Sequence, residues 1–332
     1  MFSQLNLQVD MATKWIFWVV IVGVLFGLAS TQDFNAIITK KPEAVYNHTA
    51  ALILVKFASA AYTDDQAALQ AWTCHRCGGL IQGFQLSEVI VDVPNSLQAI
   101  VGIAENLPAI VVAFRGTQET SFQNWLADLY FTQLDFNYPS VKDAMVHHGF
   151  YSAYHNTTLQ PHIVAAVQSL LQQRNGFSVM VTGHSMGGAL ASFCALDLVV
   201  NYNIQDVQVV TFGQPRIGNP IFASFYDSSV PKTIRMTHGH DIIPHLPPYY
   251  TILEERTYHH VAREVWIYTV DFGILTYETT RVCDETGEDP TCSRSVFGDS
   301  ISDHLMYLGT VLRTEHSSDS GWWLSERQYN SL

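Results

Sequence analysis

The segment around Ser185 constrains the fold more than any other part of the sequence. A short β-branched run over residues 177–182 leads into Gly183-His-Ser-Met-Gly187, and an Ala/Leu-rich helical pattern follows to Val200. A strand that turns directly into a helix holds the middle residue in a strained backbone conformation, and side chains two residues away on either side would clash. We therefore expect an accessible Ser185 hydroxyl at a strand's carboxyl end, beside the free N–H groups of a helix N-terminus. A structural Gly/Ser turn is the alternative interpretation.

Strand and helix patterns alternate along the chain. The expected strands are Val89–Val93, Ala99–Ile103, Ala109–Phe114, Val207–Phe212 and Thr233–Met236, and the expected helices are Asn47–Ala61, Tyr151–Gln173 and Gly187–Val200. Alternation of this kind predicts an α/β fold with a mostly parallel central sheet and helices on both faces. Because 48% of the residues are hydrophobic and 14% charged, the chain can bury a large core.

The first 30 residues have the pattern of a secretory signal peptide. Lys14 precedes an uncharged apolar run over residues 15–29, and small residues follow. We expect cleavage and secretion, with one domain over residues 31–332; the alternative is a membrane anchor through an uncleaved 15–29 segment. The triplets beginning at Asn47 and Asn156 are glycosylation sequons, which agrees with secretion.

The five cysteines also favour an oxidising compartment. Cys283 and Cys292 flank a polar loop and are expected to form a disulfide. Cys74 and Cys77 form a CxxC, for which redox catalysis and zinc binding are possible; we favour a short structural disulfide because no second CxxC accompanies it. Cys194 lies in an apolar helix pattern and is expected to be a buried thiol.

The formal net charge of −13 bears on partners. A chain this acidic repels phosphate backbones, so nucleic acid is not an expected partner. Anionic membrane surfaces would repel it as well. Any contact with lipid should therefore be apolar rather than electrostatic.

A serine hydroxyl needs a base, and in this type of fold the partners follow in the order serine, acid, histidine. Asp241 comes soon after the strand pattern at 233–236, whereas Asp197 and Asp206 flank the preceding helix pattern and are expected to be solvated. His304 comes late in the chain and opens an apolar stretch, so we prefer it as the base. Thr117, just after the 109–114 strand pattern, is the expected second oxyanion donor beside the Met186 N–H.

Six blocks of sequence resemble the fungal-type (class 3) lipases, in the order of that family and over roughly residues 47–310. They are Ala113-Phe-Arg-Gly-Thr117, Val146-His-His-Gly-Phe150, Gly183-His-Ser-Met-Gly-Gly188, Thr211-Phe-Gly-Gln-Pro-Arg-Ile-Gly-Asn219, Asp241-Ile-Ile-Pro-His-Leu-Pro247 and Ser302-Asp-His304. The resemblance implies an α/β-hydrolase fold, no metal or cofactor, and action on carboxylic esters, commonly glycerolipids. It implies Ser185, Asp241 and His304 as the triad, Thr117 and Met186 as oxyanion donors, and His147 beside the serine.

The family often carries a lid helix over the active site. Here Phe122, Trp125, Leu126 and Leu129 fall on one face of a helix over residues 121–130. A mobile lid and an ordinary surface helix packed on the core are both open interpretations.

We expect a monomeric lipase that acts on triacylglycerols or related glycerolipids at an apolar interface. The nearest alternatives are a phospholipase A1 and a feruloyl-type esterase. A catalytically silent hydrolase fold used for binding is an alternative from another class, and so is a CxxC redox protein, which would need a reactive Cys74.

Overall fold

The computed structural model describes residues 45–132, 134–249, 257–272 and 275–314, without the side chains of residues 119–124 and 272. These residues all belong to one compact unit, residues 43–332. The expected signal peptide and the alternative anchor at 15–29 lie outside them. Within the described ranges, none of the helices combines the length and apolar character needed to cross a membrane.

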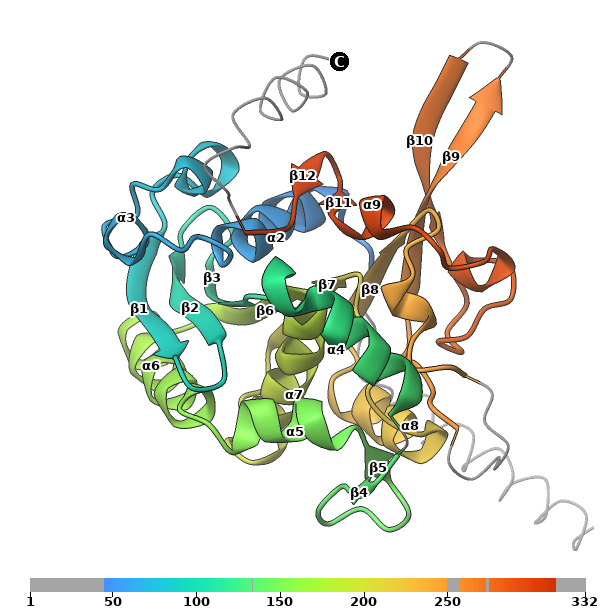
Figure 1. The fold of residues 1–332 in the computed structure, drawn as a ribbon. Coiled ribbons are helices and arrows are strands. Elements are labelled where there is room, and N and C mark those ends of the chain that lie inside the picture. The colour runs from blue at the N-terminus through green and yellow to red at the C-terminus, as the bar shows by residue number, and fades with distance from the viewer. Residues whose placement is uncertain (1–44, 133, 250–256, 273–274, 315–332) are drawn as a thin grey trace, which may run out of the picture. The chain divides into compact units, whose positions relative to one another are not determined.

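The centre of the fold is an eight-stranded sheet among the described residues (Figure 1). Its order is β1 (Gln85–Asp92), β2 (Leu97–Ala104), β3 (Ala109–Phe114), β6 (Ser178–His184), β7 (Val207–Phe212), β8 (Thr233–His238), β9 (Glu264–Phe272) and β10 (Leu275–Val282). Strands β3 to β9 are parallel neighbours, whereas β1 and β2 on one side and β10 on the other pair antiparallel. The expected mostly parallel sheet is confirmed.

Helices cover both faces of this sheet, as expected. Helix α2 (His48–Ala60) lies on one face, and α5 (His148–His155), α6 (Leu159–Gln173), α7 (Met186–Val200) and α8 (Pro220–Ser229) belong to the other side. The strands divide their side chains between two apolar clusters with period two. Val181 joins the cluster under α6 and α7, and its neighbour Met180 joins the cluster under α2.

Shorter elements complete the described fold. They are α3 (Gln66–Gln70), α4 (Glu119–Phe131), the small pairs β4 (Phe136–Asn137) with β5 (Met145–Val146) and β11 (Met306–Tyr307) with β12 (Thr310–Val311), and α9 (Ile301–His304). The helix α8 and the hairpin of β9 and β10 were not among the expected elements.

Two sequence-based expectations about the α6–α7 layer are wrong. The helix predicted over 151–173 is two helices, α5 and α6, because the buried Asp92 carboxylate accepts hydrogen bonds at 3.1 Å from both the N–H and the hydroxyl of Thr158 and so stabilises the break. Asp197 is buried rather than solvated, since it accepts hydrogen bonds from Tyr154 and Asn201. Asp206 is exposed, as expected, and pairs with Lys232.

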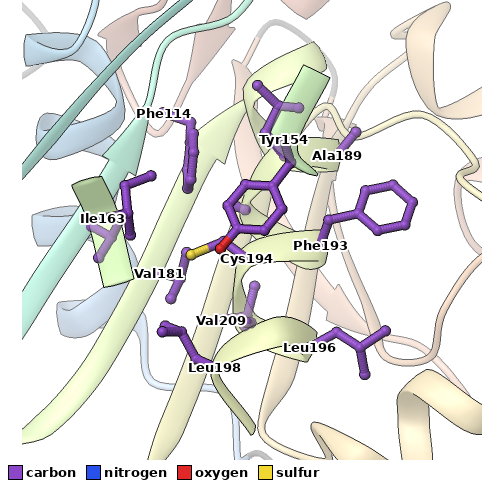
Figure 2. Close-up of a cluster of buried hydrophobic side chains, with 14 of the residues drawn as sticks. Phe114, Tyr154, Ile163, Val181, Ala189, Phe193, Cys194, Leu196, Leu198 and Val209 are labelled. Atoms are coloured by element: carbon purple, nitrogen blue, oxygen red, sulfur yellow. The ribbon is translucent and has the colours of Figure 1, made fainter. Parts of the chain in front are cut away.

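The predictions for the cysteines are confirmed. Cys74 pairs with Cys77, and Cys283 pairs with Cys292. Cys194 is a buried free thiol in the core between α7 and the sheet, where Figure 2 shows it among Tyr154, Val181 and other apolar side chains. Because burial raises the pKa of this thiol, it has the properties of a packing group rather than of a nucleophile.

Candidate active site

Ser185 lies between the end of β6 and the start of α7, as predicted. Its φ of 59° and ψ of −128° place it in the left-handed half of conformational space, which non-glycine residues rarely occupy. Its N–H donates to the carbonyl of Phe212 at the end of β7, and its carbonyl accepts from Gly188. Neighbouring backbone therefore stabilises a strained turn in a position where function commonly requires one.

Both glycines of this turn are needed, Gly183 because of contacts within the turn, as the spacing indicated, and Gly187 because of contacts with the end of β3. A Cβ on Gly183 would collide with the Gly187 carbonyl one turn later, and a Cβ on Gly187 would lie 2.5 Å from the carbonyl oxygen of Phe114. Larger residues at either position would thus push β6, α7 and β3 apart. Their close approach brings the carboxyl ends of β3 and β6 to the same place.

The Ser185 side chain is buried rather than accessible as the sequence suggested, because the loop at Gly116 packs against it, and its hydroxyl has no hydrogen-bond partner among the described residues. Buried polar groups are nearly always paired, so an unpaired hydroxyl needs an explanation. A nucleophile whose hydrogen bonds tighten only when substrate binds is such an explanation.

The folded chain brings Asp241 and His304 together, 63 residues apart in sequence. Asp241 follows β8, and its Oδ2 accepts a hydrogen bond from His304 Nδ1 at 2.9 Å; both side chains are buried. Since a carboxylate can only accept, Nδ1 carries the proton and Nε2 of the neutral ring carries the lone pair that a base needs. The Ile243 N–H donates to the other carboxylate oxygen at 2.8 Å.

The oxyanion candidates flank the same turn. Thr117 follows β3, and its hydroxyl lies 3.7 Å from the sulfur of Met186. Gly116 packs so closely on the turn at Ser185, termed the elbow (residues 183–187), that a Cβ there would lie 2.6 Å from the His184 carbonyl oxygen. The loop that carries Thr117 is therefore held directly against the segment that carries Ser185.

The predicted lid segment is helix α4. Leu129 is buried, and Trp125 and Leu126 are half-buried against the core cluster that includes Phe150. The side chain of Phe122 lies outside the described part of the structure. The three described side chains thus form the predicted apolar face, and that face packs inward.

His147 has a local structural role. Its Nδ1 accepts the Phe150 N–H at the start of α5, and its ring stacks on that of Phe150 with centroids 4.1 Å apart. Burial lowers the pKa of His147 to about 4, so the ring is neutral at physiological pH. Its expected position beside the serine remains a prediction.

The described residues contain one group with the composition of a metal site. Cys283, Asp289 and Cys292 converge, but the two sulfurs are bonded to each other, so only one carboxylate is left to act as a ligand. This group therefore lacks the ligands that a cation needs.

Known proteins resemble this chain in sequence and fold. The family model of the lipases (class 3) matches residues 111–251. A solved structure of the Rhizomucor miehei triacylglyceride lipase is 30% identical, with a TM-score of 0.67 over 80% of this chain and 97% of that chain. The chain belongs to the class 3 lipase family.

Curated relatives agree with this assignment. A lipase of Rhizomucor miehei is 33% identical over 242 residues, which is 72% of this chain and 62% of the relative. A lipase of Caenorhabditis elegans is 34% identical over 210 residues, 62% of this chain and 57% of the relative. The chain spans about three fifths of the length of the first of these curated relatives. Another solved structure, with a TM-score of 0.66, is described as a triacylglycerol lipase whose catalytic centre is a serine-protease triad.

In this class 3 lipase, the sequence patterns missed two tyrosines. One contacts Asp241, and the other contacts His184 beside Ser185. Tyr307, fully buried, donates its hydroxyl to Asp241 Oδ2 at 2.5 Å, the same oxygen that His304 contacts. Burial and the neighbouring carboxylate raise the pKa of Tyr307 well above 10, so it remains a donor. A tyrosine three residues after the histidine is the only sequence signal that could have suggested it.

The second tyrosine contacts His184, the residue that precedes Ser185. The Nε2 of His184 lies 2.8 Å from the carbonyl oxygen of His304, and Tyr62 Oη lies 2.7 Å from His184 Nδ1. Burial lowers the pKa of His184 well below its usual range, so the ring is neutral. Because a carbonyl only accepts, Nε2 must carry the proton and Tyr62 must donate to Nδ1. This chain of bonds ties the turn after α2 and the elbow to the backbone of His304.

Proposed function

We propose that this protein is a secreted serine hydrolase that cleaves carboxylic esters of glycerolipids, with triacylglycerols as the main substrate class. The observation that carries the proposal is the buried His304–Asp241 hydrogen bond of 2.9 Å at the sheet edge where Ser185 sits in a strained turn. Membership of the class 3 lipases supports it.

The proposed reaction is acyl transfer in two steps. His304 Nε2 takes the proton of the Ser185 hydroxyl as the oxygen attacks the ester carbonyl, and the N–H groups of Thr117 and Met186 stabilise the oxyanion. The C–O bond to the leaving alcohol breaks, and His304 returns the proton to that alcohol. Water then attacks the acyl-enzyme by the same route, which releases the fatty acid and restores the Ser185 hydroxyl.

Asp241 keeps the base in the productive tautomer. Its carboxylate stabilises the imidazolium that forms on His304 and does not itself take the proton. Three donors, on His304, Tyr307 and Ile243, converge on this one buried group. They satisfy a buried charge that would otherwise be costly, and they hold its orientation.

The apolar face of α4 favours a lipid substrate and a lid. Trp125 and Leu126 are large, half-buried groups on a helix joined through Gln118 to the oxyanion residue Thr117. Displacement of α4 would expose these side chains to the acyl chains and would adjust Thr117 at the same time. A relative of known structure, 30% identical, is described as a model for interfacial activation in lipases.

Secretion is supported by the two disulfides, since such bonds persist mainly in oxidising compartments. One relative, from Malassezia globosa, is named as a secreted mono- and diacylglycerol lipase and is 36% identical over 166 residues. The apolar run at residues 15–29 is the proposed export signal.

The test is hydrolysis of p-nitrophenyl esters from acetate to palmitate by the mature protein and by Ser185→Ala. We expect activity that rises with chain length and falls by several orders of magnitude in the variant. A preference for acetate would favour the esterase. Activity that survives in Ser185→Ala would refute the assignment of the nucleophile, and no hydrolysis of any ester would leave the binding protein as the better hypothesis.

A further inference from the structure

The hairpin of β9 and β10 extends beyond the rest of the sheet (Figure 1). It does so at the carboxyl ends of the parallel strands, where the proposed active site lies. β9 is parallel to β8, and the last residue of β8, His238, pairs with Ile267. β9 continues to Phe272, five residues further, or about 17 Å at the usual rise of a strand. Because Asp241 follows β8 at this same edge, the hairpin projects on the active-site side.

The two faces of this projecting hairpin differ in chemistry. Directly paired residues share a face, so Val270 lies with Tyr277, and Leu275 follows on the same side. Beyond Ile267, where β9 has passed the end of β8, the described side chains on that face are uncharged: Tyr268, Val270, Leu275, Tyr277 and Thr279. The opposite face carries Thr269, Asp271, Thr276 and Glu278. The hairpin is thus amphipathic.

The apolar side chains near the tip are left open to solvent. Leu275 is 67% exposed and Tyr277 is 50% exposed. At the base of the same face Trp266 lies opposite the exposed Arg281 and stacks on Tyr268. Val296 packs against the small cluster that Trp266 forms with Cys283 and Cys292, and the next residue, Phe297, is 80% exposed. Leu275, Tyr277 and Phe297 are termed the hairpin patch.

The hairpin patch is connected to the proposed catalytic acid. The indole N–H of Trp266 donates to the carbonyl of Gly239, two residues before Asp241. The loop beyond Phe297 reaches Ser300, whose backbone forms a bridge with Asp241. A lipid surface that binds the hairpin patch would therefore lie at a fixed position relative to Asp241.

We propose that the hairpin patch anchors the enzyme to an uncharged lipid–water interface, independently of α4; this inference rests on the proposed lipid substrate. An amphipathic element with tyrosine at its boundary suits the headgroup region of a lipid surface. The net charge of −13 favours zwitterionic or neutral lipid over anionic lipid.

A second copy of the chain fits the patch less well. Three side chains with these exposures offer on the order of 400 Å², about half of the roughly 800 Å² per partner in a standard interface. Two copies would also bring together two chains of charge −13.

The test compares two variants of the mature chain, both made with and without Ser185→Ala. Leu275→Thr with Tyr277→Thr removes the two patch side chains that the hairpin carries, leaves Phe297 in place, and puts β-branched residues in the strand. Thr280→Ser with Val282→Thr is a smaller control change at two exposed positions on the opposite face of β10, where Val282 is 55% exposed. Thermal unfolding of each variant establishes that the fold is retained.

Flotation with phosphatidylcholine vesicles, in the Ser185→Ala background, measures binding without turnover. We expect the patch variant to partition at least about tenfold less than the parent, and the control to stay within about twofold. With active Ser185, the ratio of activity on emulsified triacylglycerol to activity on a soluble ester should fall only in the patch variant.

Three results would overturn the anchor. The parent and patch variant could partition equally, the control could lose as much as the patch variant, or light scattering could show a dimer that only the patch variant dissociates while vesicle binding is unchanged. The proposed function fails separately, if the protein with active Ser185 hydrolyses no ester, whatever its vesicle binding.

Discussion

Replacement of Tyr307 by Phe removes a single hydroxyl from the environment of Asp241. The ring is fully buried among apolar groups, so Phe can occupy the same volume. What is lost is one hydrogen bond of 2.5 Å to Asp241 Oδ2. Hydrogen bonds to charged groups contribute about 1.5–3 kcal/mol, so we expect the free energy of unfolding to fall by that amount.

The same substitution should lower kcat only modestly and should change the pH dependence of the reaction. Asp241 keeps the bonds from His304 and Ile243, so its orientation is retained and kcat should fall less than about tenfold, against about 10⁴-fold for loss of the carboxylate in a triad. A carboxylate with one donor fewer stabilises the imidazolium more strongly. The acid limb of the kcat/KM profile should therefore move to higher pH.

Urea denaturation and a pH profile on a soluble ester from pH 5 to 9 would measure both effects. Tyr258→Phe is a matched control, because Tyr258 is also a buried tyrosine and contacts the His147 ring instead of Asp241. An unchanged acid limb together with unchanged stability in Tyr307→Phe would refute the assigned role, and so would an equal shift of the acid limb in the control.

Two further predictions concern stability. Arg216 and Glu288 form a buried bidentate pair at 2.7 and 2.9 Å, so Arg216→Met should cost about 3–5 kcal/mol in chemical denaturation, and adding Glu288→Leu should reduce that loss. A double variant as unstable as the single one would contradict this account. Burial raises the pKa of Asp227 to about 7, so its carboxyl stabilises the fold below its unfolded pKa near 3.9 and loses that contribution as pH rises through 7. Asp227→Asn, which keeps an acceptor for the Ala262 N–H, should therefore raise the melting temperature at pH 8 and have little effect at pH 4; an equal gain at both would rule out the titration.

Local patterns in the sequence determined the elbow of this class 3 lipase. Glycines at 183 and 187, a β-branched run before them and a helical pattern after them predicted the strained Ser185, because steric exclusion acts between near neighbours. The chain order of the acid and the histidine selected Asp241 and His304 as candidates, and the fold brings these two side chains into contact.

Contacts between distant segments were decided only by the tertiary structure. The hydroxyl of Tyr307 on β11 meets Asp241 after β8, and that of Tyr62, just after α2, meets His184 in the elbow. In the sequence alone, a tyrosine at either position is indistinguishable from an ordinary core residue. The same reason explains the wrong expectation for Asp197, which is buried because Tyr154 on another helix donates to it. Periodicity reports which face of an element is apolar, whereas a buried polar group is stabilised by partners that periodicity does not describe.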